Sequence, residues 1–323
     1  MKAIRVPRPG GPEVLELVEM PTPRPGSGEA LVRVEAAGVN FIDVYQRSGA
    51  YARQTPFVLG EEGAGLVEAV GRDVDGVRPG DRVAWASVAG SYATHALARA
   101  EKLVRIPDGL SALDAAAAML QGMTAHYLAN DTFPLKRGSV CLVHAAAGGV
   151  GLLLVQMAKL AGARVLGTVS TEAKAALARE AGADEVILYR KAPFDEAVRT
   201  RTEGRGVDVV YDSVGADTFD RSLLSLRRRG MLVLFGQASG RVRPLDLQVL
   251  NTRGSLFVTR PKLGDYIATR GELVERAQAV LEAVAGGSLK LRIHAQFPLA
   301  RAAEAHAALE SRATTGKLVL VPE

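Results

Sequence analysis

The stretch Val143-His144-Ala145-Ala146-Ala147-Gly148-Gly149-Val150-Gly151 decides the fold class of this chain of 323 residues. It follows the apolar run 139–143, which predicts a buried strand. It leads into residues 149–162, which predict a helix rich in apolar side chains. Strand, glycine-rich turn and helix in this order are typical of the start of a doubly wound parallel sheet.

The alternation of strand and helix continues downstream. Further strands are predicted at 163–169, 185–189, 207–214 and 231–236, helices between them at 171–182, 192–204 and 216–230, and a sixth strand at 254–258. Helices between successive strands give a parallel sheet with right-handed crossovers, and continuous apolar strands fit a sheet covered on both faces. The chain is therefore predicted to contain a Rossmann domain.

The first 110 residues have a different pattern, in which short apolar runs are separated by Gly- and Pro-rich turns. Strands at this spacing predict an antiparallel, barrel-like module. Ser111 and Asp114 then resemble a capping box before an alanine-rich helix. The terminal run 316–321 has no position left in the parallel sheet, so we expect it to rejoin the first module.

These patterns predict two domains. One comprises residues 1–122 plus 261–323 and carries the barrel; the other comprises residues 123–260 and binds a nucleotide. The hydrophobic fraction of 48% and the charged fraction of 23% are those of a globular protein. No window of 18 apolar residues and no secretory signal are found, so we expect a soluble, cytoplasmic protein without membrane contact.

The opening stretch also predicts a dinucleotide site. Ala146, Gly148 and Gly151 occupy the three glycine positions of the G-x-G-x-x-G motif. Small residues are required there because the pyrophosphate lies against the backbone N–H groups at the helix N-terminus. His144 lies in this turn, and we interpret it as structural. The single cysteine, Cys141, is interpreted as a small core residue, because one cysteine cannot form an internal disulfide or a thiolate zinc site.

The end of the second Rossmann strand predicts which nicotinamide cofactor binds. An NAD site places a carboxylate there for the ribose 2′-hydroxyl, whereas this chain has no acid at that point. Ser170 and Lys174 can instead donate to a 2′-phosphate, which favours NADPH. Tyr189, after the third strand, is expected either to flank the adenine or to cover the sheet edge.

Charge gives little support for binding of nucleic acid. The formal net charge is +5, with 31 Arg and 9 Lys scattered along the chain. The densest run, residues 227–229, is interpreted as a helix end capped by Gly230. Basic and aromatic residues are not interleaved, so we expect no nucleic-acid partner.

Several motifs together make the chain similar to zinc-free medium-chain dehydrogenases/reductases, and among them to the zeta-crystallin-like quinone oxidoreductases. The motifs are Gly10-Gly-Pro-Glu-Val-Leu15, Gly38-Val-Asn-Phe-Ile-Asp43, Arg78-Pro-Gly-Asp-Arg82, His144-Ala-Ala-Ala-Gly-Gly-Val-Gly151, Val210-Tyr-Asp-Ser-Val-Gly215, Leu256-Phe-Val-Thr-Arg-Pro261 and Leu309-Glu-Ser-Arg-Ala-Thr-Thr-Gly-Lys317. The resemblance implies a GroES-like β-barrel domain beside a Rossmann domain, with NADPH in the cleft between them. It also implies a homodimer formed through the edge of the Rossmann sheet.

The resemblance further implies which residues meet the cofactor. On the nicotinamide side it places Asn40, Asp43, Tyr45, Tyr51 and Thr124. At the pyrophosphate and adenosine end it places Gly148, Gly149, Val150, Gly151, Ser170, Lys174 and Tyr189. From later loops it places Ser213, Phe235, Gly236, Phe257, Val258 and Arg312.

Zinc-containing relatives carry Cys where Asn40 stands and His where Glu61 stands. Without zinc as Lewis acid, alcohol–ketone chemistry loses its main means of stabilising an alkoxide, so an alcohol dehydrogenase is not expected. Quinones need less help, because the arriving charge is delocalised over the ring. Tyr51, Tyr45 and Asn40 are the candidate donors to a quinone oxygen, and Asp43 is expected to fix its neighbours.

Three functions remain open from the sequence. The leading one is an NADPH:quinone reductase that transfers hydride or single electrons. The second is an enoyl or alkenal C=C reductase, although only Arg47 and Arg53 near Tyr51 could meet an anionic tail. The third is an NADPH-binding protein with a structural or RNA-binding role.

Overall fold

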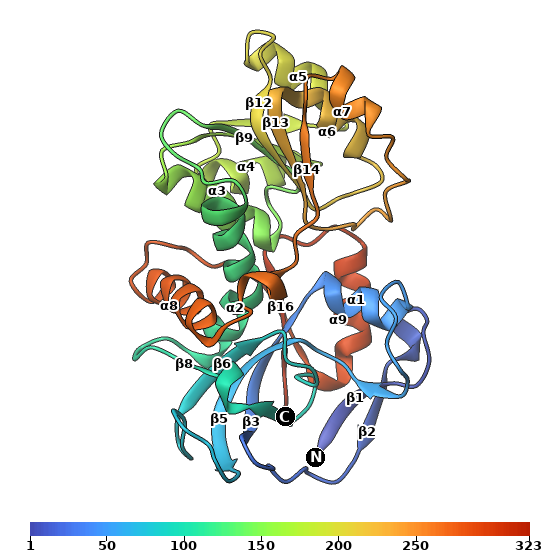
Figure 1. The fold of residues 1–323 in the computed structure, drawn as a ribbon. Helices are drawn as coiled ribbons and strands as arrows, with labels where there is room; N and C mark the ends of the chain where they lie inside the picture. The colour runs from blue at the N-terminus through green and yellow to red at the C-terminus, as the bar shows by residue number, and fades with distance from the viewer. The chain divides into compact units, whose positions relative to one another are not determined.

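The computed structural model describes residues 1–323, which form two compact units. Unit 1 comprises Met1–Met123 and Tyr266–Glu323, so it contains both chain ends (Figure 1). Unit 2 comprises Thr124–Asp265. The first boundary between the units falls within helix α2 (Ala112–Tyr127), and the second falls within η4 (Leu263–Tyr266). No helix has the length and apolarity needed to span a membrane.

Two sheets build unit 1. The larger has seven strands in the order β15-β16-β3-β5-β6-β8, with β7 also paired to β3, and the smaller has the order β2-β1-β4. All of these pairings are antiparallel except that of β15 with β16. The strands are β1 Lys2–Val6, β2 Glu16–Glu19, β3 Glu29–Val39, β4 Phe57–Val58, β5 Glu62–Val70, β6 Arg82–Ala86, β7 His95–Arg99, β8 Val104–Arg105, β15 Ile293–Pro298 and β16 Lys317–Val321.

One apolar core joins the two sheets of unit 1. Ile4 and Val6 from the small sheet share it with Val34, Trp85 and Leu320 from the large one. Such a core is the antiparallel barrel-like packing that short strands with one apolar face favour. The terminal strand β16 lies between β15 and β3, which confirms that residues 316–321 rejoin the first module.

Unit 1 also contains helices, of which α1 and α9 were not predicted. The helices are α1 Phe41–Ser48, α2 Ala112–Tyr127, which begins in this unit, α8 Arg270–Ala285 and α9 Ala302–Glu310, with short turns η1 Pro12–Val14, η2 Ala100–Lys102 and η5 Leu299–Arg301. At the start of α2, Ser111 Oγ accepts from the Asp114 amide at 3.0 Å and donates to its carboxylate at 2.6 Å. The capping prediction is confirmed, and α2 extends to Tyr127.

Unit 2 is a doubly wound sheet of six parallel strands in the order β11-β10-β9-β12-β13-β14. Its strands are β9 Val140–Val143, β10 Arg164–Val169, β11 Glu185–Leu188, β12 Val207–Asp212, β13 Leu226–Leu234 and β14 Phe257–Thr259. Its helices are α3 Gly149–Leu160, α4 Glu172–Glu180, α5 Phe194–Arg201, α6 Phe219–Ser225 and α7 Gln248–Thr252, with η3 Leu128–Thr132 after α2. The predictions of an antiparallel, barrel-like module and of a doubly wound Rossmann domain are thus confirmed.

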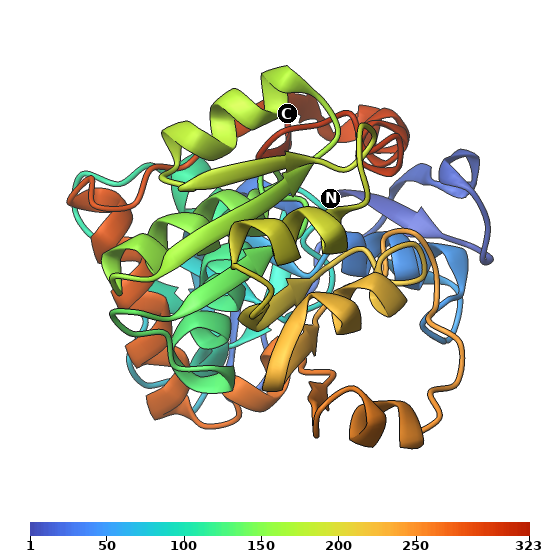
Figure 2. The same ribbon diagram turned by 90° about the horizontal axis from the view of Figure 1, so that it is seen from above.

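The winding of unit 2 reverses between β11 and β12. The chain first runs outward from β9 to β11 and then returns to the other side of β9 for β12 to β14. Because crossovers are right-handed, α3 and α4 lie on one face and α5 and α6 on the other. The packing of α3 on α4 and of α5 on α6 agrees with this (Figure 2).

The prediction for residues 227–229 was wrong. Helix α6 ends at Ser225, and the three arginines belong to β13. Leu226 pairs with Val207, but the next paired residue of β13 is Met231, opposite Val209. The intervening residues therefore form a bulge in the strand. Three basic residues followed by a glycine occur both at the end of a helix and in such a bulge, so the sequence pattern does not separate the two.

Candidate functional site

The predicted phosphate-binding turn lies between β9 and α3. Gly148 is the N-cap of α3 with extended backbone angles, and its amide donates to the Ala145 carbonyl at 2.8 Å. A Cβ atom on Gly151 would lie 2.3 Å from that same carbonyl oxygen, so only glycine lets the helix approach the turn this closely. The first-turn amides of α3, including those of Gly149 and Val150, are therefore open to an anion at the carboxyl edge of the sheet.

His144 fixes the base of this turn from inside unit 2. It is buried, and its Nδ1 and Nε2 atoms lie 2.8 Å from Thr168 Oγ1 and 3.0 Å from Ser222 Oγ. Ser222 donates its own proton to Asp212 at 2.9 Å, so it accepts from His144 Nε2–H, and Thr168 donates to Nδ1. Burial lowers the pKa of His144, which keeps the ring neutral. Both ring nitrogens are thus used within the fold.

Lys174, Arg190 and Ser170 lie where β10 and β11 end. Ser170 follows β10, and the Tyr189 amide donates to the Val169 carbonyl at 3.3 Å, which brings the ends of the two strands together. Lys174 lies in the first turn of α4 and is half-buried. Burial lowers its pKa, and the nearby charge of Arg190 lowers it further.

Arg190 is a candidate site residue that the sequence analysis did not identify. It directly follows Tyr189, and a basic residue placed just after the third strand was the signal available for it. The next cation, Lys191, instead pairs with Glu172 at 3.1 Å. Ser170, Lys174, Tyr189 and Arg190 therefore form one group that presents positive charge.

The other predicted cofactor residues of unit 2 lie in two loops and two regular elements. The Phe235 and Gly236 amides both donate to the Asp212 carbonyl, at 2.9 and 3.3 Å, which sets them beside Ser213 at the carboxyl ends of β12 and β13. Thr124 is buried in α2. On β14, Val258 is half-buried and Phe257 is 56% exposed.

In unit 1, Asn40 belongs to a buried ionic network. The Lys317 ammonium donates to Asn40 Oδ1 at 2.7 Å and to the Glu62 carboxylate. The Asn40 amide donates to Glu62 Oε2 at 2.8 Å and to the Gly38 carbonyl at 3.3 Å. The other Glu62 oxygen accepts from the Leu120 amide at the middle of α2. Asn40, Glu62 and Lys317 are all less than 5% exposed.

Asp43 holds the start of α1. Its Oδ2 atom accepts from the Asn40 amide at 2.8 Å and from the Tyr92 hydroxyl at 3.1 Å, while its buried Oδ1 atom has no hydrogen-bond partner. Burial raises the pKa of Asp43 from 3.8 to about 8, against the lowering effect of the Asn40 hydrogen bond. A carboxyl group with these partners positions the helix.

A directed chain of hydrogen bonds runs from Asp43 to half-exposed Glu310. Arg47 donates to His306 Nδ1 at 3.1 Å and to both oxygens of Glu310 at 2.9 and 2.8 Å. His306 Nε2 lies 3.2 Å from the Tyr92 hydroxyl, which donates onward to Asp43. Burial, with the charge of Arg47, lowers the pKa of His306 to about 3, so the imidazole is neutral and its Nε2 carries the proton.

Tyr45 and Tyr51 form an aromatic pair at the end of α1. Their ring centroids are 5.1 Å apart, and the Tyr51 amide donates to the Tyr45 carbonyl at 2.9 Å. Tyr51 is 38% exposed. Gly49, in the left-handed conformation, ends the helix between them and turns the chain back. Arg312, the last predicted residue of unit 1, is exposed after α9.

Comparison with known proteins places the chain in a family. Residues 26–108 match the alcohol dehydrogenase GroES-like domain, and residues 149–285 match the domain described as zinc-binding dehydrogenase. A quinone oxidoreductase of Pseudomonas aeruginosa is 47% identical over 99% of each chain. The chain belongs to the quinone oxidoreductase family.

Other relatives agree with membership of the quinone oxidoreductase family. The crystal structure of Escherichia coli quinone oxidoreductase complexed with NADPH matches the whole chain with a TM-score of 0.98 and 44% identity. A 2-haloacrylate reductase of a Burkholderia species is 43% identical over 97% of each chain.

In this quinone oxidoreductase family member, the side chains of Asn40 and Glu61 are bound to other residues of the chain. Asn40 uses its oxygen and amide group within the network, and the Lys317 ammonium already supplies a positive charge there. Glu61 accepts from Gln46 at 2.6 Å and pairs with Arg53. Zinc sites use Cys, His or carboxylate ligands that are free to coordinate, whereas Asn40 and Glu61 each bind other protein partners.

The buried Asp43 predicts a pH-dependent stability. Between about pH 4 and pH 8 the folded protein keeps a proton on Asp43 that the unfolded chain releases, so stability falls as the pH rises through this range. Asp43→Asn keeps an oxygen to accept both hydrogen bonds and cannot ionise. The difference in free energy of unfolding, Asp43→Asn minus wild type, should therefore rise with pH. The slope should be at most about 1.4 kcal/mol per pH unit.

Chemical denaturation at several pH values between 5 and 9 measures this difference. Asp108→Asn, at an exposed aspartate of the same unit, serves as the control and should show a constant difference. An Asp43→Asn protein whose stability follows the same pH profile as the wild type would contradict the assignment.

Proposed function

We propose that this chain is an NADPH-dependent reductase of quinones that works without zinc. The observation that carries the cofactor assignment is the group at the ends of β10 and β11, where neither Val169, the last residue of β10, nor Ser170 is acidic and where Lys174 and Arg190 add positive charge. A carboxylate at this place would repel a 2′-phosphate, whereas hydroxyl and cationic donors bind one. The relatives named quinone oxidoreductase support the choice of acceptor.

The residues of unit 2 suit the rest of the cofactor. The open amides at the start of α3 would hold the pyrophosphate, and the lack of side chains at Gly148 and Gly151 would let it come close. Tyr189, 45% exposed beside Ser170, offers a ring face for the adenine. When bound, NADPH supplies a hydride, and the protein's contribution is to position the acceptor and to place donors at its oxygen.

Tyr51 and Tyr45 are the donors that we propose for the quinone oxygen. Asn40 is the weaker candidate, because its amide already donates to Glu62 and Gly38. Asp43 and the chain through Tyr92 and His306 hold α1, and so hold the tyrosine pair, without moving protons themselves.

Reduction of an activated C=C bond is the second candidate, and the similarity to 2-haloacrylate reductase favours it. An anionic substrate would need a cation near Tyr51. Both guanidinium groups of that region are engaged: Arg47 with Glu310 and His306, and Arg53 with Gln46 and Glu61. This arrangement favours a neutral acceptor such as a quinone.

Initial rates of NADPH oxidation with 1,4-benzoquinone, crotonyl-CoA and a simple alkenal at equal concentration test the acceptor. We expect the quinone to react fastest. Tyr51→Phe should lower kcat by less than about a thousandfold, because one removed donor rarely costs more. Faster turnover of either alkene would move the protein to the C=C reductases, and complete loss of activity in Tyr51→Phe would make that residue essential.

The cofactor assignment predicts an effect confined to NADPH. Lys174→Ala and Arg190→Ala should each raise the Kd of NADPH about tenfold to a hundredfold, since a charge-assisted hydrogen bond contributes roughly 1.5–3 kcal/mol. The Kd of NADH should change little. Arg179→Ala, at an exposed position in the last turn of α4, is the matched control for titrations followed by nicotinamide fluorescence. Equal losses for both cofactors would refute the 2′-phosphate site.

We also propose that two copies pair through β14 and that the dimer acts in the cytoplasm. β14 is an end strand of its sheet and carries the exposed Phe257, which suits pairing with another strand. Sedimentation should then give twice the chain mass of 34.1 kDa, and Phe257→Glu should shift the mass toward one chain. A monomeric wild type would overturn the pairing.

A further inference from the structure

A groove lined by arginines lies in unit 2, away from the proposed cofactor site. Its volume is about 1180 Å³. The six arginines that line it are Arg199, Arg205, Arg227, Arg228, Arg229 and Arg253. They stand before β12, in the first part of β13 and before β14, and thus at the amino edge of the parallel sheet. The phosphate-binding turn follows β9 and so lies at the opposite, carboxyl edge.

The bulge in β13 delivers three of these side chains. Residues 227–230 leave the strand register between the Leu226 and Met231 pairings. Arg229 has a φ of 57°, and its amide donates to the Gly254 carbonyl at 2.8 Å, which ties the bulge to the turn before β14. The backbone therefore holds the bulge beside the turn that carries Arg253, and Arg229 adopts a left-handed conformation that a plain strand would not give.

The charge of the groove is largely uncompensated. One buried carboxylate, that of Asp208, serves both Arg205 and Arg227, at 2.8 and 2.5 Å. Arg199 donates to the backbone carbonyls of residues 204, 205, 224 and 226, so its position is fixed but its charge is not neutralised. Arg228, Arg229 and Arg253 have no carboxylate within ion-pair distance, and all three are exposed.

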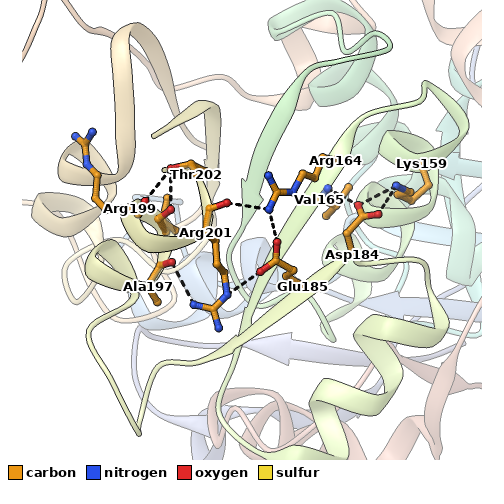
Figure 3. A network of polar contacts seen from close by, with 10 residues as sticks. Lys159, Arg164, Val165, Asp184, Glu185, Ala197, Arg199, Arg201 and Thr202 are labelled. Carbon is orange, nitrogen blue, oxygen red and sulfur yellow. Dashed lines mark hydrogen bonds and ion pairs between the residues drawn. The ribbon is translucent and has the colours of Figure 1, made fainter. Parts of the chain in front are cut away.

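At the other half of the amino edge of the parallel sheet, the cations are paired with acids. At the starts of β10 and β11, Glu185 pairs with both Arg164 and Arg201, and Asp184 pairs with Lys159 at 2.8 Å (Figure 3). Cations at the amino edge are thus matched with acids at one end of the sheet and outnumber the acids at the other. Like charges held close together repel each other, and a bound anion would relieve this repulsion.

We propose that the arginine groove binds an anion with several linked phosphates. Guanidinium groups match phosphate oxygens in pairs, and six guanidinium groups against the one carboxylate of Asp208 suit an oligophosphate better than a single phosphate. No aromatic side chain lines the groove, so it offers no platform on which the bases of a single-stranded nucleic acid could stack. The site is separate from the proposed reductase activity.

Isothermal titration of the NADPH-saturated protein with tripolyphosphate tests the proposal, since saturation keeps tripolyphosphate out of the cofactor site. The variant Arg228→Gln/Arg253→Gln should bind at least tenfold more weakly than the wild type. The control Arg24→Gln/Arg179→Gln removes the same charge at exposed positions elsewhere and should bind within twofold of the wild type. Unchanged NADPH affinity and thermal unfolding would show that both variants are folded.

Three outcomes would overturn the proposal. The first is equal binding of tripolyphosphate to the wild type and to Arg228→Gln/Arg253→Gln. The second is equal affinity for tripolyphosphate and inorganic phosphate, which would indicate a nonspecific anion site. The third is tight binding of a duplex or single-stranded oligonucleotide with none of tripolyphosphate, which would make the occupant a nucleic acid.

Discussion

The buried contact of Lys317 with Glu62 and Asn40 is the interaction on which unit 1 depends. It joins residues 255 positions apart in the chain, and it links the last strand, β16, to β5 and to the start of α1. A buried ion pair stabilises a fold only when its remaining donors and acceptors are satisfied. Here Glu62 accepts from Lys317, Asn40 and the Leu120 amide, so removing one partner would leave a buried charge, at a cost of about 3–5 kcal/mol.

Unit 2 depends on a corresponding polar centre around Asp212. Its carboxylate accepts from the Val214 and Gly215 amides and from the Thr218 and Ser222 hydroxyls. Through Ser222 and His144 this centre reaches the turn that precedes α3. Each unit therefore has a buried carboxylate, Glu62 or Asp212, that accepts several hydrogen bonds close to the residues proposed to bind cofactor or substrate. The positions of those residues are set by buried hydrogen bonds and not by exposed loops alone.

The sequence predicted unit 2 better than unit 1, and the reason is the range of the interactions. Apolar strands alternating with helices are local patterns, so the strands of unit 2 and its glycine-rich turn could be located. Helix α1 has only eight residues, and its start is held by Tyr92 and His306, which come from distant parts of the chain. Lys317 belongs to a run predicted only as an apolar strand. Its partners lie more than 250 residues away, and no local pattern reveals them.

The place of β16 within its sheet has a consequence for synthesis on the ribosome. All of unit 2 has been translated before β16 exists, because unit 2 ends at Asp265 and β16 starts at Lys317. The first strands of unit 1 must wait for residues 317–321 before β3, which also pairs with β5 and β7, gains β16 as a neighbour and Glu62 gains its counter-charge. The order of completion is thus the reverse of the usual one, in which the first segment made is the first to fold.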